Sequence, residues 1–121
     1  MFDAHIIKSE LPWLFVGQLP HLNLGTVDGT SCDVSLRTAL AGVLTAQSRY
    51  SHVVDGRFKG GHITRCHGRP NEGMHAVQLE MSWRAYLLDE SRPEDWNADK
   101  AAEVTPLLRE LVALMIDWRP T

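Results

Sequence analysis

The sequence predicts an α/β fold, in which short strands alternate with helices around one hydrophobic core. Apolar residues recur at helical spacing in two separate stretches, 34–47 and 97–118. Two other stretches, 51–55 and 74–81, have the β-branched or alternating pattern of strands. The chain of 121 residues suits one domain or part of a larger one, and we treat 1–121 as a single, partial domain.

The first expected element is a strand end at 2–7, with the sequence Phe-Asp-Ala-His-Ile-Ile. A domain that opens on half a strand suggests that upstream elements are missing. An edge strand at a terminus is the alternative, and this segment alone does not decide between them. Residues 11–28 are rich in proline, glycine and asparagine, which predicts an ordered loop.

A helix is expected next, capped by Ser31 or Asp33 and ending near Gln47. A short strand at 51–55 follows it. Residues 56–73 then form a long basic loop with many glycines and no clear secondary structure. Loops of this length inside a domain are more often functional or disordered than incidental.

In the strand expected at 74–81, the side chains alternate between the two faces of the sheet. Residues 82–90 predict a short helix. A longer helix is expected to run to about Trp118 after a cap at Asn97 or Asp99. Because Pro106 lies in its early turns, a start nearer Thr105 is the alternative.

Composition excludes several classes of function. A formal net charge of −3 gives no basic surface for nucleic acid. No apolar run is long enough to cross a membrane, and the first residues do not resemble a secretory signal. Two cysteines are too few for a disulfide framework, so a cytoplasmic, reducing location is expected.

Two residues attract attention as catalytic candidates. His5 lies toward the carboxyl end of a predicted strand, where imidazole can bind zinc, although a histidine at a frayed terminus is the commoner case. Glu80 shares a strand face with Gln78, and this face is too polar for an ordinary core. A carboxylate near a strand end can act as a general base, or can simply point at solvent.

The basic loop offers Arg57, Lys59 and Arg65, and arginine grips carboxylates with two parallel hydrogen bonds. Ordinary surface charge is the alternative explanation. His62, Cys66 and His67 do not have the spacing of a standard zinc site.

Several stretches together resemble the N-formylglutamate deformylase (N-formylglutamate amidohydrolase) family. The glycine-rich stretch is the longest and most specific. The resemblance spans nearly the whole chain, is weakest after about Glu90, and is carried by 3–5, 19–26, 28–32, 55–65, 68–70 and 75–80.

The resemblance implies the C-terminal part of a zinc-carboxypeptidase-like mixed-sheet domain with flanking helices. It implies zinc-dependent hydrolysis of N-formyl-L-glutamate to formate and L-glutamate in histidine breakdown, with N-formylglutamate or a similar N-acyl amino acid as the small-molecule substrate. By the same resemblance His5 is a zinc ligand and Glu80 the base that activates water. The implied substrate contacts are Asn23, Thr26, Arg57 and Arg65.

The sequence also departs from the family pattern. It lacks the family's Pro-His-x-Gly motif, which carries the other metal ligands. It has His62, Cys66 and His67 where the family has tyrosine, histidine and tyrosine, and Ile6 where the family prefers serine. We therefore expect an incomplete enzyme that self-associates through an uncovered sheet. The alternative is a non-catalytic homologue that binds a small acid or a partner.

Overall fold

The computed structural model describes all 121 residues and contains one mixed sheet in the strand order β1-β4-β2-β3. The strands are β1 (Phe2–Ile7), β2 (Leu22–Gly25), β3 (His52–Val54) and β4 (Val77–Ser82). β1 runs parallel to β4, and β3 runs parallel to β2. The central pair, β2 and β4, is antiparallel. The predicted α/β class is confirmed, with a sheet of mixed direction.

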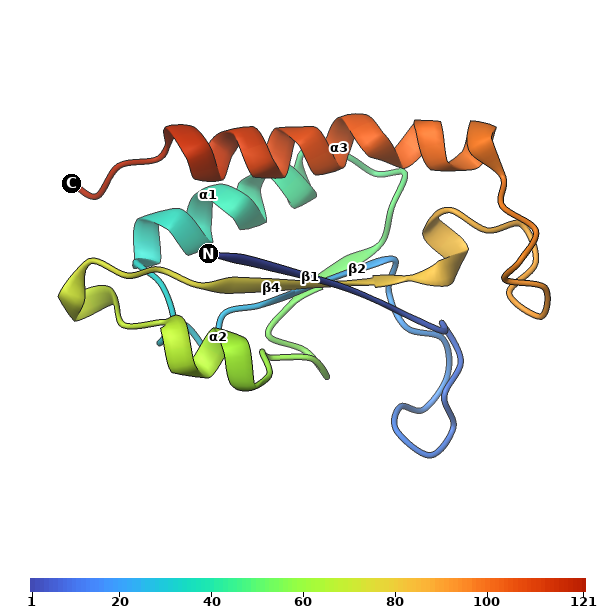
Figure 1. Cartoon of the computed structure of the whole chain (residues 1–121), viewed down its shortest axis with the longest axis horizontal. Coiled ribbons are helices and arrows are strands. Elements are labelled where there is room, and N and C mark those ends of the chain that lie inside the picture. Colours follow the sequence, from blue (N-terminus) through green and yellow to red (C-terminus); the bar gives the residue numbers. More distant parts are fainter.

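The two long helices cover one face of this sheet, and the short helix α2 lies on the other (Figure 1). Helix α1 (Val34–Thr45) begins at Asp33, whose carboxylate accepts the backbone N–H of Ser35 at 2.7 Å. Helix α3 (Ala98–Asp117) begins at Asn97 in the same way. Each helix is thus capped by one of the two residues predicted for it, Asp33 rather than Ser31 and Asn97 rather than Asp99.

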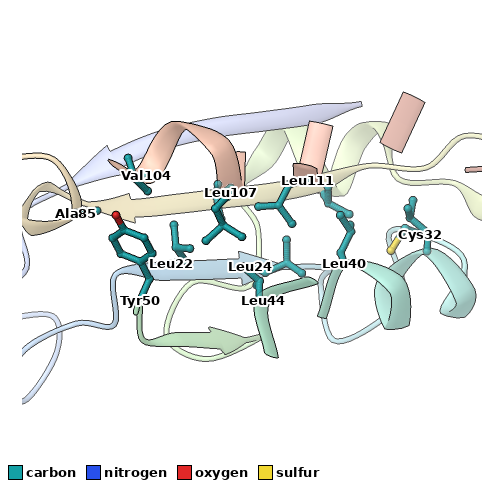
Figure 2. Packing of buried hydrophobic residues seen from close by; sticks show 13 residues of the cluster. Leu22, Leu24, Cys32, Leu40, Leu44, Tyr50, Ala85, Val104, Leu107 and Leu111 are labelled. Carbon is teal, nitrogen blue, oxygen red and sulfur yellow. The ribbon is translucent and has the colours of Figure 1, made fainter. Parts of the chain in front are cut away.

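The core fills the space between the helices and the sheet (Figure 2). Because side chains alternate along a strand, Leu22 and Leu24 point to this side, as do Val77 and Leu79 of β4. The helices meet them with leucines four residues apart. These are Leu36, Leu40 and Leu44 of α1 and Leu107 and Leu111 of α3. The opposite, polar face of the same strands is left for the site.

Three sequence predictions need correction. The predicted loop at 11–28 contains β2, whose four residues are all buried. The strand is short, but pairing on both sides stabilises it. The predicted loop at 56–73 contains α2 (His62–His67) and a 3₁₀ turn, Pro70–Glu72. The predicted helix at 82–90 is only the 3₁₀ turn Trp83–Ala85.

The alternative start of the last helix, near Thr105, is also wrong. The helix begins at Ala98, and Pro106 lies inside it with its ring exposed. The cap at Asn97 and the burial of Ala101 and Val104 fix the first turns. None of the helices is both long enough and apolar enough to cross a bilayer.

Candidate active site

A cleft of about 720 Å³ lies on the polar face of the sheet. The sheet forms its floor, and the segment between β3 and α2 forms its wall, on the side of the sheet where Figure 1 shows α2. Only two of its thirteen lining residues are hydrophobic. The lining consists of Asp3, His5, Gln78 and Glu80 from the strands, and Gly56–Ile63 and Arg65 from the wall.

The floor places four polar side chains on two adjacent strands. His5 is paired with Glu80 across the parallel ladder, and Asp3 is paired with Gln78. The Nε2 atom of His5 lies 2.9 Å from Oδ1 of Asp3. The sequence alternation along β4 therefore predicted correctly that Gln78 and Glu80 share one face.

Glu80 is only 8% exposed, although it borders the cleft. Burial raises the pKa of its carboxyl group; the nearby His5 opposes this shift, and Asp3 adds to it. A carboxylate with a raised pKa holds a proton more readily than one in water. Such a group suits a general base that must accept a proton from water.

The wall carries two arginines that are fixed at one nitrogen and open at the other two. The Nε of Arg57 donates to the carbonyl of Leu14 at 2.9 Å. The Nε of Arg65 donates to the carbonyl of Gly60 at 3.1 Å. Their terminal nitrogens make no hydrogen bond or ion pair within the chain, and can bind carboxylates in the cleft.

Lys59 differs from the arginines. Its ammonium group lies 3.0 Å from a carboxylate oxygen of Asp28, so it is already paired at the rim. The free positive charge of the cleft therefore comes from the two arginines. The predicted residues His5, Arg57, Arg65 and Glu80 all border one cleft.

The structure does not place Asn23 and Thr26 among the residues that line the cleft. Both are buried. The Asn23 amide donates to the carbonyls of Pro20 and Glu80, at 3.0 and 3.1 Å. The Thr26 hydroxyl donates to Asp55 at 2.5 Å. Both side chains therefore bond to residues below the cleft and do not contribute to its surface.

Sequence reasoning missed Asp3 as a member of the site. Its signal was present, because Asp3 lies two residues before His5 in a strand and must share its face. His62 also lines the cleft, at the start of α2. Cys66 lies beside it in an adjoining hollow, and both cysteines of the chain are free thiols.

The donor set does not fit a catalytic zinc site, which needs three protein ligands and an open position. No group of three or more His, Cys, Asp or Glu side chains converges anywhere in the chain. In the cleft the single imidazole on the floor, His5, has its Nε2 directed at Asp3. These residues supply at most part of a metal site.

The chain is similar to known proteins over nearly its whole length. The sequence pattern of the family described as N-formylglutamate amidohydrolase matches residues 1–87. An N-formylglutamate deformylase of Pseudomonas aeruginosa is 48% identical over 118 residues. One of Pseudomonas putida is 45% identical. Each match covers 98% of this chain and 44% of the relative.

A solved structure has the same fold. It is the N-formylglutamate amidohydrolase of Ralstonia eutropha JMP134, with a TM-score of 0.72 and 23% identity. The match covers 93% of this chain and 39% of that one. The chain thus spans less than half the length of the relatives that it matches.

Proposed function

Because the chain belongs to the N-formylglutamate amidohydrolase family, we propose that its cleft binds N-formyl-L-glutamate for hydrolysis to formate and L-glutamate, or binds a similar N-acyl amino acid for hydrolysis to the corresponding acid and amino acid. One arrangement carries the proposal. A buried carboxylate with a raised pKa, Glu80, shares a cleft with the free guanidinium ends of Arg57 and Arg65. The substrate has two carboxylates and an amide, which these groups complement.

In this proposal the arginines bind the substrate carboxylates and thereby orient the formyl amide. Glu80 accepts a proton from water as the water oxygen bonds to the formyl carbon. The C–N bond then breaks, and the proton passes from Glu80 to the leaving amine. A general base of this kind contributes roughly 10²–10⁴-fold to the rate.

Zinc is part of the expected chemistry of the family, but this chain alone offers His5 and its neighbour Asp3 on the floor. Since a catalytic zinc needs three protein ligands, these residues alone do not complete a zinc site. The same resemblance supports two further proposals, a partial zinc-carboxypeptidase-like domain and a role in histidine breakdown. The proposed cytoplasmic location rests on the low cysteine count.

A second candidate is a non-catalytic module that binds a small dicarboxylate. The observation in its favour is that the cleft has groups that can bind an anion but no complete set of metal ligands. The two arginines are already positioned for an anion, whereas no three metal-ligating side chains converge. This candidate differs from the first only in the absence of bond cleavage.

Titration of the chain with N-formyl-L-glutamate, followed by amide NMR shifts, tests the shared part of both candidates. We expect saturable shifts around the cleft, and Arg65→Ala should weaken binding roughly 10–100-fold, as expected for a lost charge-assisted contact. Arg92→Ala is the matched control, because Arg92 is an exposed arginine paired with Asp95 away from the cleft. Absence of saturable shifts in the unaltered chain would contradict the proposal.

Release of formate from the same samples distinguishes the two candidates. Formate that appears with the unaltered chain, and not with Glu80→Gln, supports hydrolysis. Binding without formate release supports the binding module.

A further inference from the structure

We propose that Thr26, Asp55 and Arg37 form a clamp that positions the cleft loop, residues 56–61, and so sets how tightly the cleft binds its anionic ligand. The inference rests on the proposed function and assigns these three as positioning residues. None of them lines the cleft. They act through the loop that carries one arginine and anchors the other.

Asp55 is the centre of the clamp and directly precedes the loop. Its side chain is 5% exposed. It accepts the backbone N–H and the hydroxyl of Thr26, at 2.6 and 2.5 Å. It also accepts Nη2 and Nε of Arg37, at 3.0 and 3.2 Å. Such a buried carboxylate with several donors is fixed in place, and fixes the chain that follows it.

Two further contacts hold the middle and the end of the cleft loop. The backbone N–H of Val27 donates to the carbonyl of Lys59 at 2.7 Å. The N–H of Gly61 donates to Oε1 of Gln78 on the cleft floor, also at 2.7 Å. The loop is therefore fastened at its start, middle and end.

The loop also lies in direct contact with the end of β2. A Cβ atom on Gly25 would lie 2.6 Å from the carbonyl carbon of Lys59 and 2.8 Å from the nitrogen of Gly60. No real side chain approaches backbone so closely, so only glycine permits this packing. The loop has no room to shift toward the sheet.

The backbone around the clamp is strained. Val27, Asp28 and Asp55 have φ values of 50°, 54° and 53°, in the left-handed region that few residues other than glycine, asparagine and aspartate adopt. It is most unfavourable for a β-branched residue such as Val27. Strain of this kind persists only where surrounding contacts over-determine it, and it is concentrated at functional sites. Here the contacts that hold it are those of the clamp.

Both arginines of the cleft depend on this loop. Arg57 lies within it, two residues after Asp55. Arg65 lies outside it, but its Nε donates to the carbonyl of Gly60, which belongs to the loop. A loop that loosens would therefore displace both guanidinium groups together. The clamp controls the two anion contacts as one unit.

The test compares Thr26→Val, which removes the hydroxyl while keeping the shape, with Thr26→Ser, which keeps the hydroxyl. Two readouts are measured: amide hydrogen exchange of residues 57–61, and the dissociation constant for N-formyl-L-glutamate. Thr26→Val should exchange faster in the loop and bind about tenfold more weakly. Thr26→Ser should stay close to the unaltered chain in both.

Glu103→Gln is the matched control, because it removes an exposed ion pair with Arg49 far from the loop. If Thr26→Val folds poorly, Arg37→Gln removes donors to Asp55 from a half-exposed position and serves instead. The inference would be overturned if Thr26→Val had the same amide hydrogen exchange in the cleft loop, or the same affinity for N-formyl-L-glutamate, as the Glu103→Gln control. If the unaltered chain does not bind N-formyl-L-glutamate, the proposed function fails. The amide hydrogen exchange of the cleft loop then decides by itself whether the clamp holds the loop.

Discussion

At the scale of single residues, the site and the stability of the fold make opposite demands on Glu80. The proposed base must be ionised before it can accept a proton. Burial beside Asp3 disfavours the ionised form and raises the pKa of the group. The residue that is proposed to do the chemistry is therefore one that weakens the fold at neutral pH.

Glu80→Gln should raise the melting temperature at pH 7. The pKa in the folded chain lies above the ordinary value of 4.5, so ionisation costs more in the folded chain than in the unfolded one. This cost is complete above the folded pKa and disappears below about pH 4.5, where both states are protonated. The advantage of the variant should therefore shrink as the pH is lowered. Thermal denaturation followed by circular dichroism at pH 4 to 8 measures this.

Glu94→Gln is the control for this comparison, since Glu94 is an exposed carboxylate in a turn. It should change the melting temperature little at any pH. An equal or lower melting temperature for Glu80→Gln at pH 7 would show that burial does not penalise the ionised form.

Most of the proposed site could be predicted from the sequence, but not all of it. Glu80 was identifiable because strand alternation places it on a polar face, and Arg57 and Arg65 because they lie in a glycine-rich basic loop. Asn23 and Thr26 do not line the cleft, and the sequence could not show this, since whether a polar side chain reaches the cleft or the structure below it depends on tertiary packing. The order of residues along the chain does not show which polar side chains line the cleft and which lie below it.

At the scale of elements, α3 keeps its helical course through a proline. Pro106 is exposed and lacks an N–H, so the carbonyl of Ala102 has no helical partner. The buried face on the other side, with Val104 and Leu107, holds the helix against the core. Tertiary packing thus overrides a strong local signal.

Pro106→Ala should stabilise the chain by about 1–3 kcal/mol, because it restores one hydrogen bond and removes the ring from a helix interior. Greater entropy of the unfolded chain offsets part of this gain, by roughly 0.4–1 kcal/mol. Urea denaturation followed by circular dichroism measures the difference. Pro120→Ala, in the exposed segment after the helix, is the matched control and should be neutral. A loss of stability would mean that the proline ring makes a favourable contact at this position.

The same principle explains which elements were found from sequence. Both long helices have an apolar stripe and a capping residue, and both were predicted. Strand β2 has four residues and was hidden among turn formers; only its two neighbours in the sheet define it. Helix α2 was not predicted because glycines, which are typical of loops, precede it. One of them, Gly61, is the N-cap residue of the helix.

At the scale of the whole molecule, the sheet has an open edge at β1, which pairs only with β4. Ala4 and Ile6 are exposed, and the side chain of Ile6 is on the helix-covered face with 57% of its surface accessible. Val112 and Ile116 of α3 are exposed as well. Open edges with apolar neighbours favour pairing with further strands.

We predict that the chain self-associates at micromolar concentration through β1. Ile6→Lys should shift it toward the monomer, because a charged side chain on an edge strand opposes edge-to-edge pairing. Sedimentation velocity over a range of concentrations measures this. Val16→Lys is the control, since Val16 is an exposed apolar residue in a loop away from the edge. A monomer at all concentrations, or an equal effect of both variants, would contradict the prediction.

The order of strands has a consequence for how the site forms in time. Phe2 pairs with Val77, so β1 finds its place only when a segment of about 75 residues closes on itself. Pairing over such separations is slow compared with the formation of a helix. A strand with one neighbour is also among the first elements to open in a folded protein. We therefore expect Asp3 and His5, on the edge strand β1, to join the cleft later and to leave it earlier than Glu80, which lies on the central strand β4.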